Sequence, residues 1–471
     1  MIAQNEIQYF VNQLVRLAKT IRALEGNPTL PLIFYGPSRH LVVASEDGIT
    51  VAKAYKTSRQ WLDEVANLQI FAEINRDRSK VLEDIIAQEL PYIGLPTIDP
   101  RLDMSRIGVR EEFSPIAIFS PVQGKILYTR TRDGIATFGD YLSAAVQIAR
   151  IQEEGKIHKD RLGSKDVVRN AKDEGQPETS YFLERFRDIC LGQLTKYGEV
   201  QITPAQQQLM IVDWETLVAE QLVRAHNKGF NGYYFDGQPR HHFIDPSTKR
   251  IVSIDFEYRI QTPALFGLAS LLSFGLSRDG ETYLSEDEQL NILDRFLLEI
   301  EFARAMGDGR PLKDKARRIH EYVQTRNAQY NGNLSGKDGD QFFRFLGEDD
   351  LDRGKRRRED FSAHWLYALL DRSAAWLGHK ARYRAIAQHL IQQKILENEG
   401  IQSEISLPVK QNTIEQITHL TQILLILEGL QKGTKNGRYV TDAAKRLYDN
   451  FRMIAGQPYF STDGYRALAV K

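Results

Sequence analysis

The spacing of apolar residues along the chain changes from helical to alternating and back again. Residues 3–25 carry apolar side chains at helical intervals, and the Gly-Asn-Pro sequence at 26–28 stops this helix. Three short, apolar and β-rich runs follow, at 31–35, 40–44 and 49–55. Helical spacing returns over 58–75, and further strand-like runs lie at 115–119 and 125–129. The pattern therefore predicts a small sheet and one prominent helix in the N-terminal part.

Beyond about residue 138 the pattern is mostly helical, with one interruption. The segments with helical spacing are 141–152, 214–226, parts of 264–330, 361–396 and 412–432. Between them, residues 230–260 contain two short apolar runs that are typical of a β-hairpin. The order of these elements predicts an α+β fold, with a strand-rich unit followed by a larger helical unit.

Composition narrows the class of protein without identifying it. The 471 residues include 62 Lys and Arg and 62 Asp and Glu, so the net charge is zero. This balance argues against a partner bound through overall charge, such as bulk nucleic acid or an anionic membrane. A single cysteine, Cys190, excludes an internal disulfide and a multi-cysteine zinc site. Because the N-terminus lacks a signal-peptide pattern and no apolar run reaches about 18 residues, we expect a cytoplasmic protein.

Lys53 and Glu64 are the first pair of residues that could carry chemistry. Lys53 lies inside an apolar strand, on the face of Val51 and Tyr55. Glu64 lies on the apolar-rich face of the helix that follows. Two opposite charges directed inward can serve as partners for each other, and such a lysine could present its ammonium group to a phosphate. The alternative is an edge-strand lysine that reaches water and a glutamate at the rim.

The turn between the first two predicted strands contains Gly36 and Ser38. A short Gly/Ser loop at this place could direct backbone N–H groups toward a phosphate. It has one glycine, and Pro37 supplies no N–H group, so taken alone the segment favours an ordinary hairpin turn.

Two aspartates flank the predicted hairpin within 230–260. Asp236 lies in the loop before the first strand, and Asp255 follows the second strand. The hairpin would bring both carboxylates to one end, where they would suit a general base and a ligand of a divalent metal ion. The alternative is a pair of hydrophilic hairpin ends without chemistry.

These segments together resemble the aminoglycoside phosphotransferase and small-molecule kinase branch of the protein-kinase-like fold. The catalytic loop of that family reads His-Gly-Asp, four residues and Asn, and Asp236 stands at the loop aspartate. The sequence Ile254-Asp255-Phe256-Glu257 matches the second motif of the family, and 263–274 resembles the helix that follows it. Upstream, Lys53 and Glu64 match the phosphate-binding lysine and its helix partner. The resemblance covers about residues 30–300, with the motifs in the expected order.

The resemblance implies a bilobal fold with ATP and Mg²⁺ as cofactors. Residues 1–119 would form the small lobe, 120–300 the hinge and helical lobe with an insertion near 155–205, and 301–471 a helical C-terminal extension. Each site residue then takes the role of its counterpart in the family. Lys53, held in place by Glu64, would bind the α and β phosphates, and the loop with Gly36 and Ser38 would cover them. The backbone of Ser120 and Val122 would contact the adenine. Asp255 would bind Mg²⁺, and Asp236 would be the base for an acceptor hydroxyl.

The chain departs from the family at three of these positions. Tyr234 replaces the usual His, Gly267 stands at a position that is usually Asp, and His241 stands at the metal-binding Asn. His241 would be a second metal ligand or a donor to a phosphate oxygen, although Mg²⁺ prefers oxygen ligands. Two hypotheses follow: a kinase that phosphorylates a small molecule or a protein, or a pseudokinase that works as a nucleotide-binding scaffold. Transfer of a nucleotidyl group is a variant of the first.

The remaining charged segment is the basic cluster at 353–358. It contains Lys355 and four arginines and is flanked by acidic residues on both sides, which is typical of a solvated surface. A local patch for nucleic acid or an acidic partner is the alternative. The sequence names no acceptor, and neither 155–205 nor 301–471 carries a motif that indicates one.

Overall fold

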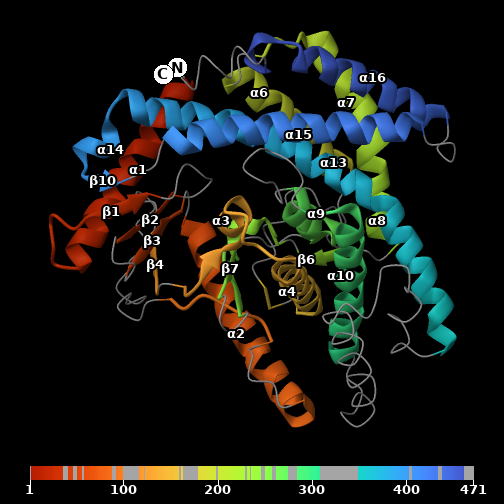
Figure 1. Cartoon of the computed structure of the whole chain (residues 1–471), viewed down its shortest axis with the longest axis horizontal. Coiled ribbons are helices and arrows are strands. Elements are labelled where there is room, and N and C mark those ends of the chain that lie inside the picture. Colours follow the sequence, from red (N-terminus) through yellow and green to blue (C-terminus); the bar gives the residue numbers. More distant parts are fainter. Residues whose placement is uncertain are drawn as a thin grey trace.

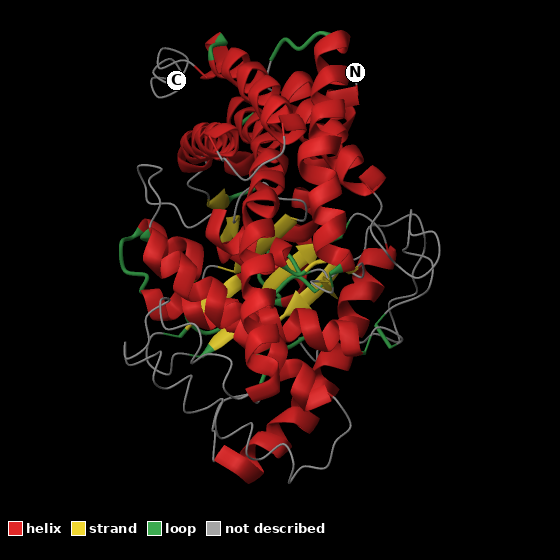
Figure 2. Cartoon of the chain, turned by 90° about the vertical axis from the view of Figure 1, so that its right-hand side faces the viewer, coloured by secondary structure: helices red, strands yellow, loops and turns green. Residues whose placement is uncertain are grey.

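The structure is a computed structural model of the chain. It describes residues 2–34, 41–45, 50–55, 58–86, 92–98, 116–120, 122–158, 161–162, 179–197, 200–228, 231–233, 235–245, 250–256, 261–273, 284–307, 348–402, 406–432 and 438–460. Figure 2 shows the strands in the middle of the molecule, with helices around them.

The N-terminal part forms the predicted sheet. Its strands lie in the order β10-β1-β2-β3-β4, and the pairs from β1 to β4 are antiparallel. The bounds are β1 (Leu32–Phe34), β2 (Leu41–Ser45), β3 (Val51–Ala54) and β4 (Ile116–Phe119). Helix α1 (Ile2–Leu24) precedes them, and α2 (Ser58–Ile86) follows β3 and continues past the predicted end at 75. The order of these elements agrees with the apolar pattern.

The predicted strand at 125–129 is wrong for most of its length. Only β5 (Lys125–Ile126) is a strand, and helix α3 (Leu127–Arg132) follows it directly. The hydroxyl of Thr131 donates to the carbonyl of Leu127 one helical turn earlier, and the Asp133 N–H caps the helix end on Thr129. The strand β5 pairs with β7 (His242–Ile244), which pairs with β8 (Ile251–Ser253) as the expected hairpin.

The middle of the chain is helical, as the spacing predicts. The helices are α4 (Phe138–Ile157), α5 (Thr179–Glu184), α6 (Gly192–Tyr197), α7 (Pro204–Trp214), α8 (Glu220–Asn227), α9 (Leu265–Ser273) and α10 (Glu286–Gly307), with π-helical segments at Arg185–Leu191 and Glu215–Ala219. Two short strands, β6 (Asn231–Tyr233) and β9 (Gln261–Pro263), pair beside α4. Thr137 and Thr203 begin α4 and α7 with capping boxes.

The C-terminal part spans both other parts of the molecule (Figure 1). It contains α13 (Glu348–Gln392), α14 (Ile395–Asn398), β10 (Ile401–Gln402), α15 (Ser406–Lys432) and α16 (Arg438–Ala455). Helix α13 packs on α8 and α9, and its C-terminal end shares a core with α1 through Ile386 and Leu390. Strand β10 then pairs parallel with β1. Residues far along the chain therefore complete the N-terminal sheet.

The helices in the described ranges differ from membrane-spanning helices. None of them is long and apolar enough to cross a membrane.

Candidate functional site

Lys53 and Glu64 form a buried ion pair. The Lys53 Nζ lies 2.7 Å from Glu64 Oε2, and the Tyr55 hydroxyl donates to the same oxygen at 2.6 Å. Lys53 comes from β3, which pairs with β2 on one side and β4 on the other, and Glu64 comes from α2. The edge-strand alternative for Lys53 is therefore wrong. A lysine fixed on a central strand by a carboxylate holds its ammonium group in a defined position.

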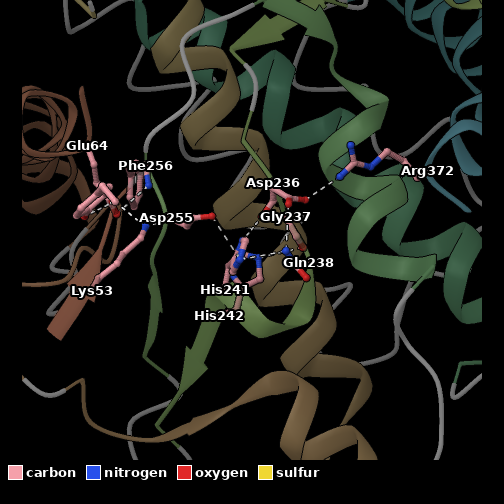
Figure 3. Close-up of polar contacts among 11 residues, drawn as sticks. Lys53, Glu64, Asp236, Gly237, Gln238, His241, His242, Asp255, Phe256 and Arg372 are labelled. Carbon is pink, nitrogen blue, oxygen red and sulfur yellow. Dashed lines mark hydrogen bonds and ion pairs between the residues drawn. The ribbon is translucent and has the colours of Figure 1, made fainter. Parts of the chain in front are cut away.

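Asp255 joins this pair from the end of the β7–β8 hairpin (Figure 3). Its Oδ1 lies 2.5 Å from Lys53 Nζ. Asp255 is one of two non-glycine residues in the described ranges with a positive φ, at 76°. This left-handed conformation is costly for an aspartate and persists where surrounding contacts enforce it, as at functional sites.

Helix α2 supplies contacts that enforce this conformation. The Phe256 N–H donates to Glu64 Oε1 at 3.3 Å, and Asn67 Nδ2 donates to the Phe256 carbonyl at 2.7 Å. Asn67 also donates to the Tyr233 hydroxyl at 2.8 Å. Since Glu64 and Asn67 lie one turn apart on α2, the position of this helix fixes the backbone next to Asp255.

Asp236 lies at the same end of the hairpin, linked to Asp255 through His241. The His241 Nδ1 lies 2.7 Å from the Asp236 carbonyl, and a carbonyl accepts, so Nδ1 carries the hydrogen. Gln238 Nε2 lies 3.0 Å from both Asp236 Oδ2 and His241 Nε2. Its two amide hydrogens can serve both of these atoms. His241 Nε2 is also 3.5 Å from Asp255 Oδ2. The structure thus brings both predicted aspartates and His241 together.

His242 holds the loop that contains Asp236 in place through two hydrogen bonds. Its Nε2 donates to the Gly237 carbonyl at 3.2 Å, and its Nδ1 accepts from the Ser253 hydroxyl at 3.0 Å. Burial and the neighbouring His241 lower the pKa of His242 to about 3. The imidazole is therefore neutral at neutral pH and joins the loop that contains Asp236 to β8.

This burial predicts a loss of stability in mild acid. Below the ordinary histidine pKa of about 6.5, the unfolded chain binds a proton at His242 that the folded chain excludes until about pH 3. His242 alone should then lower the free energy of unfolding by about 2 kcal/mol between pH 7 and pH 5. Urea unfolding at both pH values measures this, and the variant His242→Gln should lose about 2 kcal/mol less than the natural protein. Equal losses in both proteins would contradict it.

Arg372, which the sequence did not suggest, binds Asp236 from α13. Its Nη2 lies 2.9 Å from Asp236 Oδ1, and both side chains are almost fully buried. The guanidinium carbon lies 5.9 Å from the Phe266 ring centre and 5.8 Å from that of Trp376. Figure 3 shows that Arg372 approaches Asp236 from the side opposite to Lys53 and Asp255. The residue is 136 positions away from Asp236, and no local pattern marks it.

A second buried charge cluster contacts the loop that follows Asp236, through Arg240. Glu415 of α15 pairs with Lys380 of α13 and with Arg240 at 3.3 Å, and it accepts from the Tyr128 hydroxyl. Arg240 lies over the Tyr128 ring, 4.1 Å from its centre. Burial opposes ionisation of Glu415, but Lys380 and Arg240 outweigh it and hold its pKa well below the ordinary range. Burial and Arg240 lower the pKa of Lys380 to about 8.

The glycine at position 267, where the family usually has Asp, has a packing explanation. A Cβ atom at Gly267 would lie 2.6 Å from Ile148 Cγ2 and 2.8 Å from Gln152 Nε2. A Cβ atom at Gly237 would lie 2.5 Å from the Gly267 carbonyl oxygen. The loop, α9 and α4 therefore approach too closely for a larger side chain.

The remaining predicted site residues lie at the sheet or outside the described ranges. Ser120 follows β4, and its backbone N–H donates to the Thr97 carbonyl at 2.9 Å, so this N–H group is already used. Val122 is described and half-buried. Gly36, Ser38 and Tyr234 fall outside the described residues.

Asp255 offers the chemistry that a Mg²⁺ ion needs. Mg²⁺ takes oxygen ligands and often uses one or two carboxylates, with phosphates and water filling the other positions. One Asp255 oxygen faces Lys53 and the other faces His241. Within the described ranges, no three His, Cys, Asp or Glu side chains are grouped so that they could hold a metal ion. The donor set fits a Mg²⁺ that shares its coordination with a nucleotide, with His241 engaged by Gln238 rather than open.

The chain was compared with family models, curated proteins and solved structures, and only solved structures match. No family model and no curated protein matches the sequence. Aminoglycoside phosphotransferase APH(3'')-Id from Streptomyces rimosus is similar in structure, with a TM-score of 0.33 and 18% identity over 59% of this chain and 88% of that chain. A choline/ethanolamine kinase family protein from Mesorhizobium loti has a TM-score of 0.32 and 12% identity, over 72% and 92%.

Proposed function

We propose that this chain is an ATP- and Mg²⁺-dependent phosphotransferase with a hydroxyl acceptor. The observation that carries the proposal is the junction of Lys53, Glu64 and Asp255, in which residues up to 202 positions apart meet around a strained aspartate. Asp236 lies at the same end of the hairpin, one histidine away. Such an arrangement provides a cation for phosphates, a metal ligand and a base in one place.

Each residue then has a defined task. Lys53, held by Glu64, would leave Asp255 and pair with the α and β phosphates. Asp255 would hold a Mg²⁺ ion, which would supply positive charge against that of the phosphates. Asp236 would orient the acceptor hydroxyl and take its proton. Gln238 and His241 would keep the Asp236 carboxylate and backbone in place. The adenine would meet the backbone at Val122, at the hinge between two lobes divided near residue 120.

A pseudokinase is the second candidate, and one observation favours it. Both oxygens of Asp236 are engaged, one by Arg372 and the other by Gln238. A carboxylate held in this way cannot face a hydroxyl without rearrangement. In this case the fold would bind nucleotide and serve as a scaffold.

Thermal unfolding in the presence of ATP, with and without Mg²⁺, shows whether the protein binds the nucleotide. A nucleotide at 100 times its Kd stabilises the protein by about 2.7 kcal/mol. The proposal expects a shift that depends on Mg²⁺, followed by release or transfer of the γ-phosphate. A shift without any γ-phosphate chemistry favours the pseudokinase, and no shift under either condition contradicts nucleotide binding.

A further inference from the structure

Helix α2 carries Glu64 on a face that continues along almost its whole length. Asn67, Phe71, Asn75 and Arg78 follow Glu64 at steps of three or four positions. At about 100° per residue, these five side chains lie within a stripe about 80° wide. The exposed side chains at positions 69, 73, 76 and 80 lie on the opposite face. The rotation of α2 about its axis therefore decides whether Glu64 faces Lys53.

The first half of this stripe packs against Phe256 and Tyr233. The Phe71 ring centre lies 5.3 Å from that of Phe256 and 5.9 Å from that of Tyr233. Asn67 donates to the Phe256 carbonyl and to the Tyr233 hydroxyl. Glu64 itself accepts from the Phe256 N–H, beside the Lys53 ammonium group (Figure 3). These contacts hold the N-terminal half of α2.

Asn75 connects the second half of the stripe to a segment that also contacts β8. Its Oδ1 accepts from the Ile93 N–H at 2.7 Å. The carbonyl of the next residue, Gly94, accepts from Gln147 Nε2 of α4 at 3.0 Å and from the Ser253 N–H of β8 at 3.0 Å. The segment 93–94 therefore lies between α2, α4 and the second strand of the hairpin.

Arg78 ends the stripe with a two-pronged ion pair. Its Nε and Nη2 lie 2.8 Å and 3.1 Å from the two carboxylate oxygens of Glu154 on α4, and its Nη1 donates to the Met306 carbonyl of α10 at 3.0 Å. Burial opposes ionisation of Glu154, but hydrogen bonds from His158 and Arg78 outweigh it and hold the pKa of Glu154 below its ordinary value. Because a guanidinium is planar, bonds from all three of its nitrogens fix its direction as well as its distance.

We propose that Arg78 is a positioning residue for the Lys53–Glu64 pair and acts through the rotation of α2. This inference rests on the proposed phosphotransferase function, in which Glu64 holds the phosphate-binding Lys53. Arg78 lies about 21 Å from Glu64 along the helix axis, at about 1.5 Å per residue, so it acts only through the helix. A helix anchored at both ends of one face cannot turn without breaking contacts at each end. When Arg78 is removed, turning breaks fewer contacts, and Glu64 leaves Lys53 and the Phe256 N–H more often.

Hydrogen exchange of the Phe256 amide reports the position of Glu64 without any nucleotide. This N–H donates to Glu64 Oε1, so movement of Glu64 exposes it. Labelling Asp with carbon-13 and Phe with nitrogen-15 selects the Asp-Phe steps in an NMR spectrum, and the chain has two, at 255–256 and 360–361.

Arg78→Gln should accelerate exchange at Phe256 about tenfold or more, which corresponds to the loss of one charged hydrogen bond. Exchange at Phe361, which lies on α13, should stay unchanged. The affinity for ATP with Mg²⁺ should fall about tenfold, because Lys53 is then held less firmly. Arg78→Lys keeps the charge without the two-pronged geometry and should show a smaller acceleration.

Arg304→Gln is the matched control. Arg304 pairs at 2.7 Å with Glu153, the neighbour of Glu154 on α4, but it comes from α10 rather than α2. Both arginines are half-buried and both carboxylates are buried. Arg304→Gln should therefore leave exchange at Phe256 and the affinity for ATP unchanged.

The outcomes distinguish this inference from the function on which it rests. Natural exchange at Phe256 in both Arg78 variants overturns the positioning role. An equal acceleration in Arg304→Gln, or at Phe361, overturns it too, because it shows a loss of overall stability. Since the exchange is measured without nucleotide, failure of the natural protein to bind ATP contradicts the proposed function and leaves the link from Arg78 to Glu64 intact.

Discussion

Asp236→Asn is expected to lower the rate of ATP turnover by about 10²–10⁴-fold while ATP affinity is kept. An amide cannot take the proton of an attacking hydroxyl, but it preserves the shape of the side chain next to Gln238. Asp236 lies on the far side of His241 from Asp255, so the nucleotide side should be undisturbed. ADP formation with water as the acceptor measures turnover, and calorimetry measures ATP affinity.

Asp213→Asn serves as the control for this substitution. Asp213 pairs with Arg446 between α7 and α16, away from the hairpin. Turnover at the natural rate in Asp236→Asn would remove the central assignment of the base. A fall in turnover of similar size in Asp213→Asn would show that the effect is one of folding.

Glu415→Ala is expected to lower the free energy of unfolding by about 3–5 kcal/mol. Glu415 is buried and is the common partner of Lys380, Arg240 and Tyr128. Its removal leaves two cations close together without their carboxylate. The pKa of Lys380, already lowered to about 8 by burial and Arg240, should fall further. Urea unfolding monitored by circular dichroism measures the loss.

The same helix provides the matched control. Glu428 also lies on α15 and pairs with Lys432, but this pair is exposed to water. Glu428→Ala should therefore leave stability within experimental error of the natural protein. A comparable loss in both variants would mean that helix α15, rather than the buried cluster, accounts for the effect.

The sequence predicts the parts of the site that are local. Lys53 and Glu64 follow from a strand and the helix beside it, since the direction of each side chain is set by the period of its element. Asp236 and Asp255 flank a hairpin whose strands alternate and turn within a short segment. The helix at Leu127–Arg132 was predicted as a strand because its run of apolar residues is too short to distinguish the two periods.

The long-range contacts of the site could not be predicted from the sequence. Arg372 reaches Asp236 across 136 positions, and Arg240 reaches Glu415 across 175. In the sequence Arg372 and Glu415 belong to stretches of ordinary helical spacing, where a charged residue usually faces water. The pairing of β10 with β1 could not be predicted either, because a strand of two residues is too short to show an alternating pattern. The structure thus gives part of the C-terminal segment a place beside the candidate catalytic loop.

Calorimetric titration of ATP into the natural protein and into Asp255→Asn, each with and without Mg²⁺, tests the proposed function most directly. The natural protein should bind ATP more tightly with Mg²⁺ present, because the Asp255 carboxylate contributes to holding the ion. Asp255→Asn should bind ATP with an affinity that Mg²⁺ no longer improves. An equal gain from Mg²⁺ in both proteins, or no binding of ATP by the natural protein, would contradict the proposed function.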